Sequence, residues 1–209
     1  MKVEEFKDPY LGKTWQELGA RIFSSGDRIS VTLGYPANGL QPQLQKQLGE
    51  FLGRADIDLE LRFVADHGRA FNQVKNIVLV ASGKGGVGKS TSAVNLALAL
   101  DAEGAKVGLL DADIYGPSQG VMLGVEEGRR PDIKDGKYFE PIRAHGLKAM
   151  SMSFMTTDKT PMVWRGPMAS GALQQILGQT LWGDLDYLII DMPPGTGDIH
   201  LTLSQKAPV

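Results

Sequence analysis

The first third of the chain has a hydrophobic pattern typical of a small α+β unit. Residues 28–35 and 57–64 alternate polar and apolar side chains, which predicts two half-buried strands. Between them, residues 40–52 place leucine and phenylalanine at helical spacing, which predicts an amphipathic helix. We therefore expect a small α+β domain over residues 1–72, followed by a polar linker within 67–76.

Beyond this linker, strand-sized apolar runs alternate with helical segments. Such alternation predicts an α/β domain over residues 75–209, with a mostly parallel sheet and flanking helices. Residues 124–136 are rich in glycine, proline and charge, which predicts a surface loop. The predicted strands are 77–81, 106–110, 138–142, 146–152 and 185–191, and the predicted helices are 92–100 and about 169–181.

A glycine-rich segment connects the first of these strands to the first helix. Residues 82–91 contain the pattern G-x-x-x-x-G-K-[ST] in a strand–turn–helix context, which is typical of a phosphate-binding loop. Glycines let the backbone close on an anion, so that successive N–H groups point into one concavity. Lys89 would reach the β- and γ-phosphates, and the Ser90 hydroxyl would bind Mg²⁺. The predicted nucleotide-binding residues here are Gly83, Lys84, Gly85, Gly86, Val87, Gly88, Lys89, Ser90 and Thr91.

Acidic residues stand at the ends of two further strands. Asp111 and Asp113 follow strand 106–110, and Asp191 ends the last apolar strand. Ligands of open α/β sheets bind beyond the carboxyl ends of the strands, where carboxylates can hold Mg²⁺ or orient an attacking water. With Ser90, we predict Asp191 as a magnesium residue and Asp111 as a support for Mg²⁺ or for a switch. Asp191 also begins a D-x-x-x-G pattern whose Gly195 N–H would sense the γ-phosphate.

Composition narrows the function classes. The 209 residues are 42% hydrophobic and 22% charged with a formal charge of −2, an ordinary globular balance that does not point to nucleic acid. The apolar runs are far shorter than a membrane span, and the first residues lack an apolar signal core, so we expect a cytoplasmic protein without a membrane partner. The chain has no cysteine, which excludes disulfides and thiolate metal sites within it.

Four motifs together resemble one family closely. Lys84, directly after the first glycine of the loop, resembles the deviant Walker A group that includes MinD. With the segments 111–118, 164–168 and 191–198, the chain resembles the Mrp/ApbC iron–sulfur cluster carrier ATPases over residues 75–209. MinD-like and ParA-like proteins share the first and last of these motifs. The motif Asp8-Pro9-Tyr10-Leu11-Gly12 and the strand–helix–strand order of the first domain resemble a short domain of iron–sulfur assembly proteins.

The resemblance implies a nucleotide-sandwich homodimer with ATP and Mg²⁺ as cofactors. In such a dimer Lys84 would reach the partner's nucleotide, and Asp113 would position or deprotonate the attacking water. The catalytic residues it implies are thus Lys84, Lys89 and Asp113, and ATP hydrolysis would gate delivery of clusters to apo iron–sulfur proteins. Arg165 would contact the partner or a phosphate, or else simply hold its loop.

The family continues past residue 209, with further strands and the Cys-x-x-Cys pair that holds the cluster. We therefore expect this cysteine-free chain to be a C-terminally truncated carrier ATPase that cannot assemble the cluster site by itself. Two alternatives stay open. One is a MinD/ParA-type positioning ATPase, which the lack of a basic amphipathic tail disfavours. The other is a nucleotide-binding adaptor with little turnover.

Overall fold

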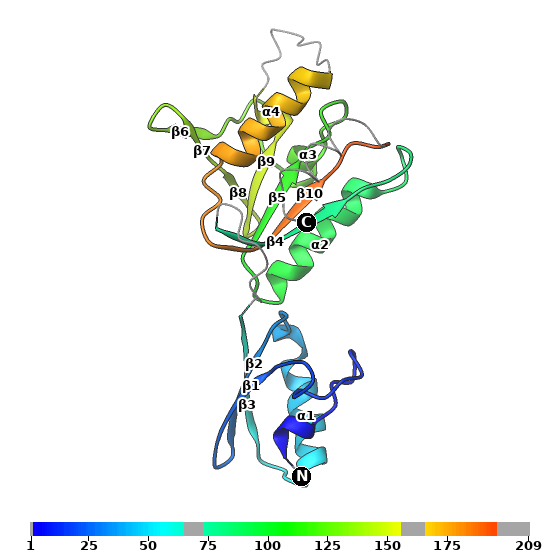
Figure 1. Cartoon of the computed structure of the whole chain (residues 1–209), viewed down its shortest axis with the longest axis vertical. Helices are drawn as coiled ribbons and strands as arrows, with labels where there is room; N and C mark the ends of the chain where they lie inside the picture. Colours follow the sequence, from blue (N-terminus) through cyan, green and yellow to red (C-terminus); the bar gives the residue numbers. More distant parts are fainter. Residues whose placement is uncertain (1, 65–72, 156–165, 196–209) are drawn as a thin grey trace. The chain divides into compact units, whose positions relative to one another are not determined.

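A computed structural model describes residues 2–64, 73–155 and 166–195 (Figure 1). The chain forms two compact units, which we treat separately. The first consists of residues Met1–Asp66 with Ala102–Ala105, and the second of His67–Asp101 with Lys106–Val209. No helix in the described ranges is long and apolar enough to cross a membrane.

The first unit contains a three-stranded sheet with the order β1-β2-β3 and one long helix. Strand β1 (Arg21–Ser25) is antiparallel to β2 (Arg28–Leu33), and β2 is parallel to β3 (Asp58–Phe63). Helix α1 (Gln41–Leu52) buries Leu44 and Leu48 against the sheet, as its periodicity predicts. Strand β1 was not predicted, because four of its five residues are exposed and its side chains do not alternate. Short 3₁₀ helices η1 (Val3–Glu5) and η2 (Asn38–Leu40) complete the unit.

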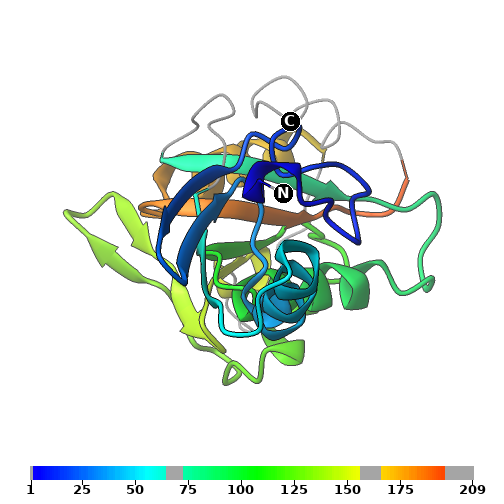
Figure 2. The same cartoon turned by 90° about the horizontal axis from the view of Figure 1, so that it is seen from below.

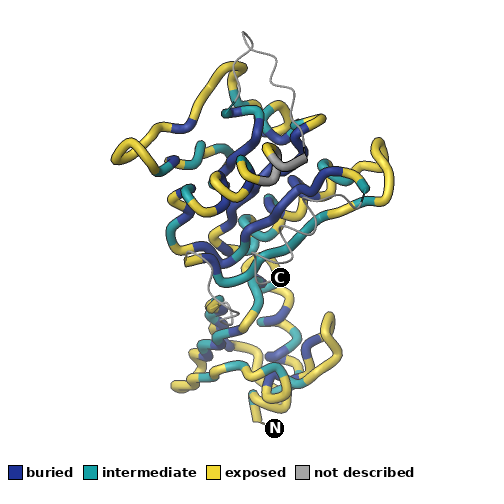
Figure 3. The backbone as a smooth tube through the Cα atoms, turned by 45° about the horizontal axis from the view of Figure 1, so that its top comes forward, coloured by how far each residue is buried: buried dark blue, intermediate teal, exposed yellow. Residues whose placement is uncertain are grey.

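The second unit is built on a five-stranded sheet with the order β4-β10-β5-β9-β8. Strands β4 (Val74–Val80), β10 (Leu185–Asp191), β5 (Val107–Asp111) and β9 (Leu147–Ser151) are parallel to one another, and β8 (Ile142–Ala144) is antiparallel to β9. All five residues of β5 are buried, and Figure 3 shows β5 and β10 as the most continuously buried part of the unit. A mostly parallel sheet with flanking helices confirms the predicted α/β class.

The two long helices of this unit cover opposite faces of the sheet (Figures 1 and 2). Helix α4 (Gly166–Gln179) packs Leu173 and Ile176 into a core that includes Leu110 and Ile190. Successive side chains of a strand point to opposite faces of the sheet. The strand residues next to Leu110 and Ile190 therefore point to the other face, which helix α2 (Lys89–Ala102) covers with buried alanine and valine side chains. Helix α2 therefore lies directly on the sheet, with its first residues at the carboxyl ends of the strands.

Smaller elements correct several predictions. The predicted loop 124–136 contains strand β6 (Asp132–Lys134), which pairs with β7 (Tyr138–Glu140) in a hairpin. The segment predicted as an excursion of two short strands instead contributes β9 to the central sheet. Between β5 and this hairpin lies a one-turn helix, α3 (Gln119–Met122), and after β9 comes the 3₁₀ helix η3 (Met152–Met155).

The predicted linker, residues 67–76, ends too late, because its last residues belong to strand β4. Strand β4 begins at Val74, which pairs with Leu185, although Lys75 and Asn76 are polar. Both side chains find partners on Asp186: Lys75 Nζ donates to Asp186 Oδ1 at 2.8 Å, and Asn76 Nδ2 donates to the Asp186 carbonyl at 3.1 Å. These bonds satisfy the polar groups and let the strand extend into a segment that reads as linker.

Candidate nucleotide site

The phosphate loop, residues 82–88, is almost entirely exposed. Gly86 and Gly88 have φ angles of +75° and +85°, a left-handed conformation that side chains with a Cβ rarely adopt. A Cβ placed on Gly83 or Gly85 would meet nothing within 4 Å, so the loop surrounds open space. None of the amides of residues 83–88 donates a hydrogen bond to a described residue. The loop thus has the donors and the room that a phosphate nest needs.

Helix α2 starts where this loop ends. Lys89 and Ser90 are its first residues, and the Ser92 N–H and hydroxyl both donate to the Gly88 carbonyl, at 2.9 and 3.0 Å. Thr91 is exposed on the same turn. The arrangement places a helix N-terminus, which favours anions, behind the phosphate loop.

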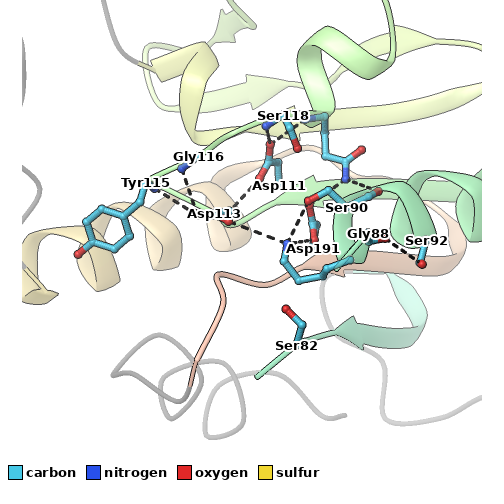
Figure 4. Close-up of polar contacts among 12 residues, drawn as sticks. Ser82, Gly88, Ser90, Ser92, Asp111, Asp113, Tyr115, Gly116, Ser118 and Asp191 are labelled. Carbon is cyan, nitrogen blue, oxygen red and sulfur yellow. Dashed lines mark hydrogen bonds and ion pairs between the residues drawn. The ribbon is translucent and has the colours of Figure 1, made fainter. Parts of the chain in front are cut away.

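Lys89 reaches across to Asp191 at the end of strand β10. Figure 4 shows Asp191 close to Ser90 and Asp113. Its Nζ donates to Asp191 Oδ1 and, at 3.1 Å, to Ser90 Oγ, and it lies 4.0 Å from Asp113 Oδ2. The Lys89 side chain is 7% exposed and that of Asp191 is fully buried. The structure thus brings together Lys89, Ser90, Asp113 and Asp191, which the sequence predicted as site residues.

Asp111 lies beside Asp191 in the sheet register and is fully buried. Its Oδ1 accepts the Asp113 N–H at 3.1 Å, and its Oδ2 accepts the N–H groups of Ser118 and Gln119 at 2.9 and 3.0 Å. Burial raises the pKa of Asp111 to about 6; the three backbone donors oppose this rise, and the Asp191 charge adds to it. Asp111 therefore braces the loop after β5, while its predicted support of Mg²⁺ stays a prediction.

Asp113 is 8% exposed and shapes the next turn. Its Oδ1 accepts the N–H groups of Tyr115 and Gly116, both at 3.2 Å. Its Oδ2 is the oxygen that faces Lys89. Oδ1 of Asp113 thus stabilises the turn at residues 115–116, and Oδ2 is directed toward the site. The role of Asp113 in orienting the attacking water stays a prediction.

Gln119, on α3, belongs to the site but was not among the residues predicted from the sequence. This residue is 1% exposed, and its Nε2 donates to the Ser90 carbonyl at 3.0 Å and to Asp191 Oδ2 at 2.9 Å. Its partners lie 29 and 72 positions away in the chain, so no local spacing reveals them. We call Asp111, Asp113, Gln119 and Asp191 the acidic cluster.

Two predicted residues have other partners in this structure. The Gly195 N–H, predicted to sense the γ-phosphate, donates to the Ser82 carbonyl at 3.0 Å and joins the end of β10 to the start of the phosphate loop. Lys84 is exposed, and its carbonyl accepts the Ser82 hydroxyl at 2.9 Å. Arg165 and the motif residues 196–198 lie outside the described residues.

The donor set fits magnesium. Ser90, Asp111 and Asp191 present hydroxyl and carboxylate oxygens, the ligands that Mg²⁺ prefers, and a hydroxyl with one or two carboxylates is the usual protein share of a magnesium–nucleotide site. Within residues 2–64, 73–155 and 166–195, no group of three histidine, cysteine, aspartate or glutamate residues could hold a metal by itself. An iron–sulfur cluster does not fit these residues, because its usual thiolate ligands are missing from the sequence.

Comparison with known proteins points to the same chemistry. A family model described as the ParA, NUBPL iron-transfer P-loop NTPase matches residues 73–209. The iron–sulfur cluster carrier protein of Pseudomonas fragi is 74% identical over 136 residues, covering 65% of this chain and 47% of that protein. The carrier protein of Haemophilus influenzae is 48% identical and covers 99% of this chain and 60% of its own length. The chain thus spans about half the length of the curated relatives it matches.

A solved structure with bound nucleotide is also similar to this chain. The nucleotide-binding protein of Archaeoglobus fulgidus, in complex with ADP, is 41% identical with a TM-score of 0.54. The match covers 65% of this chain and 51% of that one. Together with the family match, it confirms that the fold is that of a P-loop NTPase and that the resemblance seen in the motifs is correct.

Proposed function

Because the chain belongs to the NUBPL iron-transfer family of ParA-type P-loop NTPases, we propose that it binds and hydrolyses ATP as part of an iron–sulfur cluster carrier. One observation carries the proposal: the buried Lys89–Asp191 pair lies directly behind an open glycine loop. Relatives named iron–sulfur cluster carrier proteins, and a relative solved with ADP, support the same function.

The site residues divide the work of phosphoryl transfer. Amides of the phosphate loop and the Lys89 ammonium would bind the β- and γ-phosphates, and Ser90 and Asp191 would hold Mg²⁺. When bound, Mg²⁺ would neutralise part of the negative charge of the phosphates. Asp113 Oδ2, directed toward Lys89, orients the attacking water. Positioning and charge neutralisation thus account for the catalysis.

A homodimer completes the site in this proposal. Lys84 is exposed in the phosphate loop, and in the dimer its ammonium would contact the nucleotide held by a second copy. ATP binding closes the dimer and hydrolysis reopens it, which couples turnover to transfer of a cluster to apo iron–sulfur proteins. The cluster is cargo, and its ligands lie outside these 209 residues, which contain no cysteine.

The test compares the wild type with Lys89→Ala in binding of a fluorescent ATP analogue and in phosphate release. We expect Mg²⁺-dependent binding and turnover in the wild type, and loss of both in Lys89→Ala. Lys134→Ala, which removes an exposed lysine of strand β6, is the matched control and should match the wild type. A wild-type protein without Mg²⁺-dependent nucleotide binding would refute the proposal, and binding without turnover would favour the adaptor.

Cluster carriage needs its own experiment. The complete gene product is reconstituted anaerobically with iron and sulfide, and an apo iron–sulfur protein is then added. We expect an iron–sulfur absorption spectrum that moves to the acceptor, faster with ATP and Mg²⁺. Failure to acquire a cluster would remove the carrier function while leaving the ATPase proposal standing.

A further inference from the structure

Gln119 connects three parts of the nucleotide site that are distant in the chain. Its backbone N–H donates to Asp111 Oδ2, and its side-chain Nε2 donates to both the Ser90 carbonyl and Asp191 Oδ2. Through these bonds, the end of β5, the first turn of α2 and the end of β10 meet at one residue, the first by its backbone and the other two by its side chain. Among the described residues, Lys89 is the other side chain that forms hydrogen bonds with both Ser90 and Asp191.

The orientation of the Gln119 amide is settled by its neighbours. A backbone carbonyl and the ionised carboxylate of Asp191 can only accept hydrogen bonds, so the nitrogen must be the end that faces them. Asp191 is thereby held at both oxygens, by Lys89 at Oδ1 and by Gln119 at Oδ2. Such a carboxylate has one orientation instead of several.

The other end of the same amide has no partner. Gln119 Oε1 is buried and accepts no hydrogen bond from any described residue. A buried polar atom without a partner is costly, and in a native protein it usually signals a ligand or water. The oxygen is bonded to the same carbon as Nε2, so it lies close to the Asp191 carboxylate.

We propose that Gln119 is a positioning residue of the magnesium–nucleotide site. Its amide nitrogen orients the Asp191 carboxylate, and its amide oxygen accepts a hydrogen bond from the hydration shell of Mg²⁺, which keeps several waters in nucleotide sites. The inference rests on the proposed function, because it assigns a residue to the same site. Gln119 acts on the ion only through Asp191 and water, so it is distinct from the ligands themselves.

The experiment measures ADP affinity by calorimetry on the complete gene product, once with excess Mg²⁺ and once in EDTA. Gln119→Met keeps the length and volume of the side chain but removes both hydrogen-bonding ends. We expect the affinity gained from Mg²⁺ to fall about tenfold in this variant, the effect of losing a hydrogen bond to a charged group. The affinity in EDTA should stay within about twofold of the wild type, because the phosphate loop is untouched.

Gln175→Met is the matched control. Gln175 lies exposed on α4, where its amide donates only to Gln179, so both affinities should equal those of the wild type. If Gln119→Met keeps the full Mg²⁺ effect, the positioning role is wrong while the proposed function stands. If it loses affinity equally in EDTA, its role is structural and the inference is also wrong. If the wild type shows no Mg²⁺ effect, the proposed function itself fails.

Discussion

The phosphate loop and the acidic cluster face the same site but are built in opposite ways. Residues 83–88 are exposed, have open space around them and keep their shape through backbone conformation. Asp111, Gln119 and Asp191 are buried and are held by bonds from elements far apart in the chain. The difference teaches that the loop is arranged for an external ligand, whereas the carboxylates of Asp111 and Asp191 already have hydrogen-bond partners within the protein.

This contrast has an energetic consequence. An exposed loop contributes little to the free energy of unfolding, so substitutions of its side chains should change nucleotide binding or turnover more than stability. A buried charged network is costly to disrupt, so substitutions there should destabilise the second unit even without nucleotide.

Asp191→Ala should have the largest effect. It leaves the nearly buried Lys89 ammonium without its main partner, and breaking a buried ion pair in this way costs about 3–5 kcal/mol. Urea unfolding followed by circular dichroism measures the loss. The double variant Lys89→Met/Asp191→Leu should recover most of it, because neither charge then remains buried. A loss below about 1 kcal/mol in Asp191→Ala would show that Lys89 is solvated.

Asp111→Asn should destabilise the second unit by about 2 kcal/mol. Both oxygens of Asp111 accept hydrogen bonds from backbone N–H groups. In the asparagine variant the side-chain NH₂ group would face at least one of these buried N–H groups, and two donors cannot bond to each other. The control is Asp132→Asn, at an exposed aspartate of β6, which should change the free energy of unfolding by less than about 0.5 kcal/mol. Equal effects for the two variants would contradict the bracing role of Asp111.

Gly88→Ala should cost about 1 kcal/mol, because alanine is strained at a φ of +85°. Gly85→Ala is the matched comparison, since Gly85 has the same open space without a left-handed φ. It should leave the free energy of unfolding unchanged or raise it slightly. If both glycines tolerate alanine equally, backbone conformation does not maintain the loop.

Lys84→Ala should have the smallest effect on stability, within about 0.5 kcal/mol, because the residue is exposed. Nucleotide affinity should also stay near the wild-type value. If Lys84 acts across a dimer as proposed, the hydrolysis rate should nevertheless fall about 100-fold, as on removal of one transition-state donor. Unchanged phosphate release would show that Lys84 has no catalytic role.

Prediction from sequence succeeded where interactions are local. The strand–glycine–helix order around residues 82–91 and the periodicity of α1 depend on neighbours a few positions apart, and both are found where expected. Strand β1 was not predicted because its exposed residues do not alternate between polar and apolar. The predicted start of β4 was several residues too late, because the polar residues at its beginning are bonded to Asp186. The roles assigned to the site residues stay predictions until the variants are measured.

By itself, the sequence determined the α/β class, the phosphate loop and the placement of acidic residues at strand ends, because each follows from spacing along one segment. Only the tertiary structure decided that Asp191 lies beside Asp111, since this depends on β10 being inserted between β4 and β5. It also decided that Gln119 closes the cluster. The physical reason is that burial and hydrogen bonding join residues by distance in space, and the order of strands in a sheet is not encoded in any local pattern.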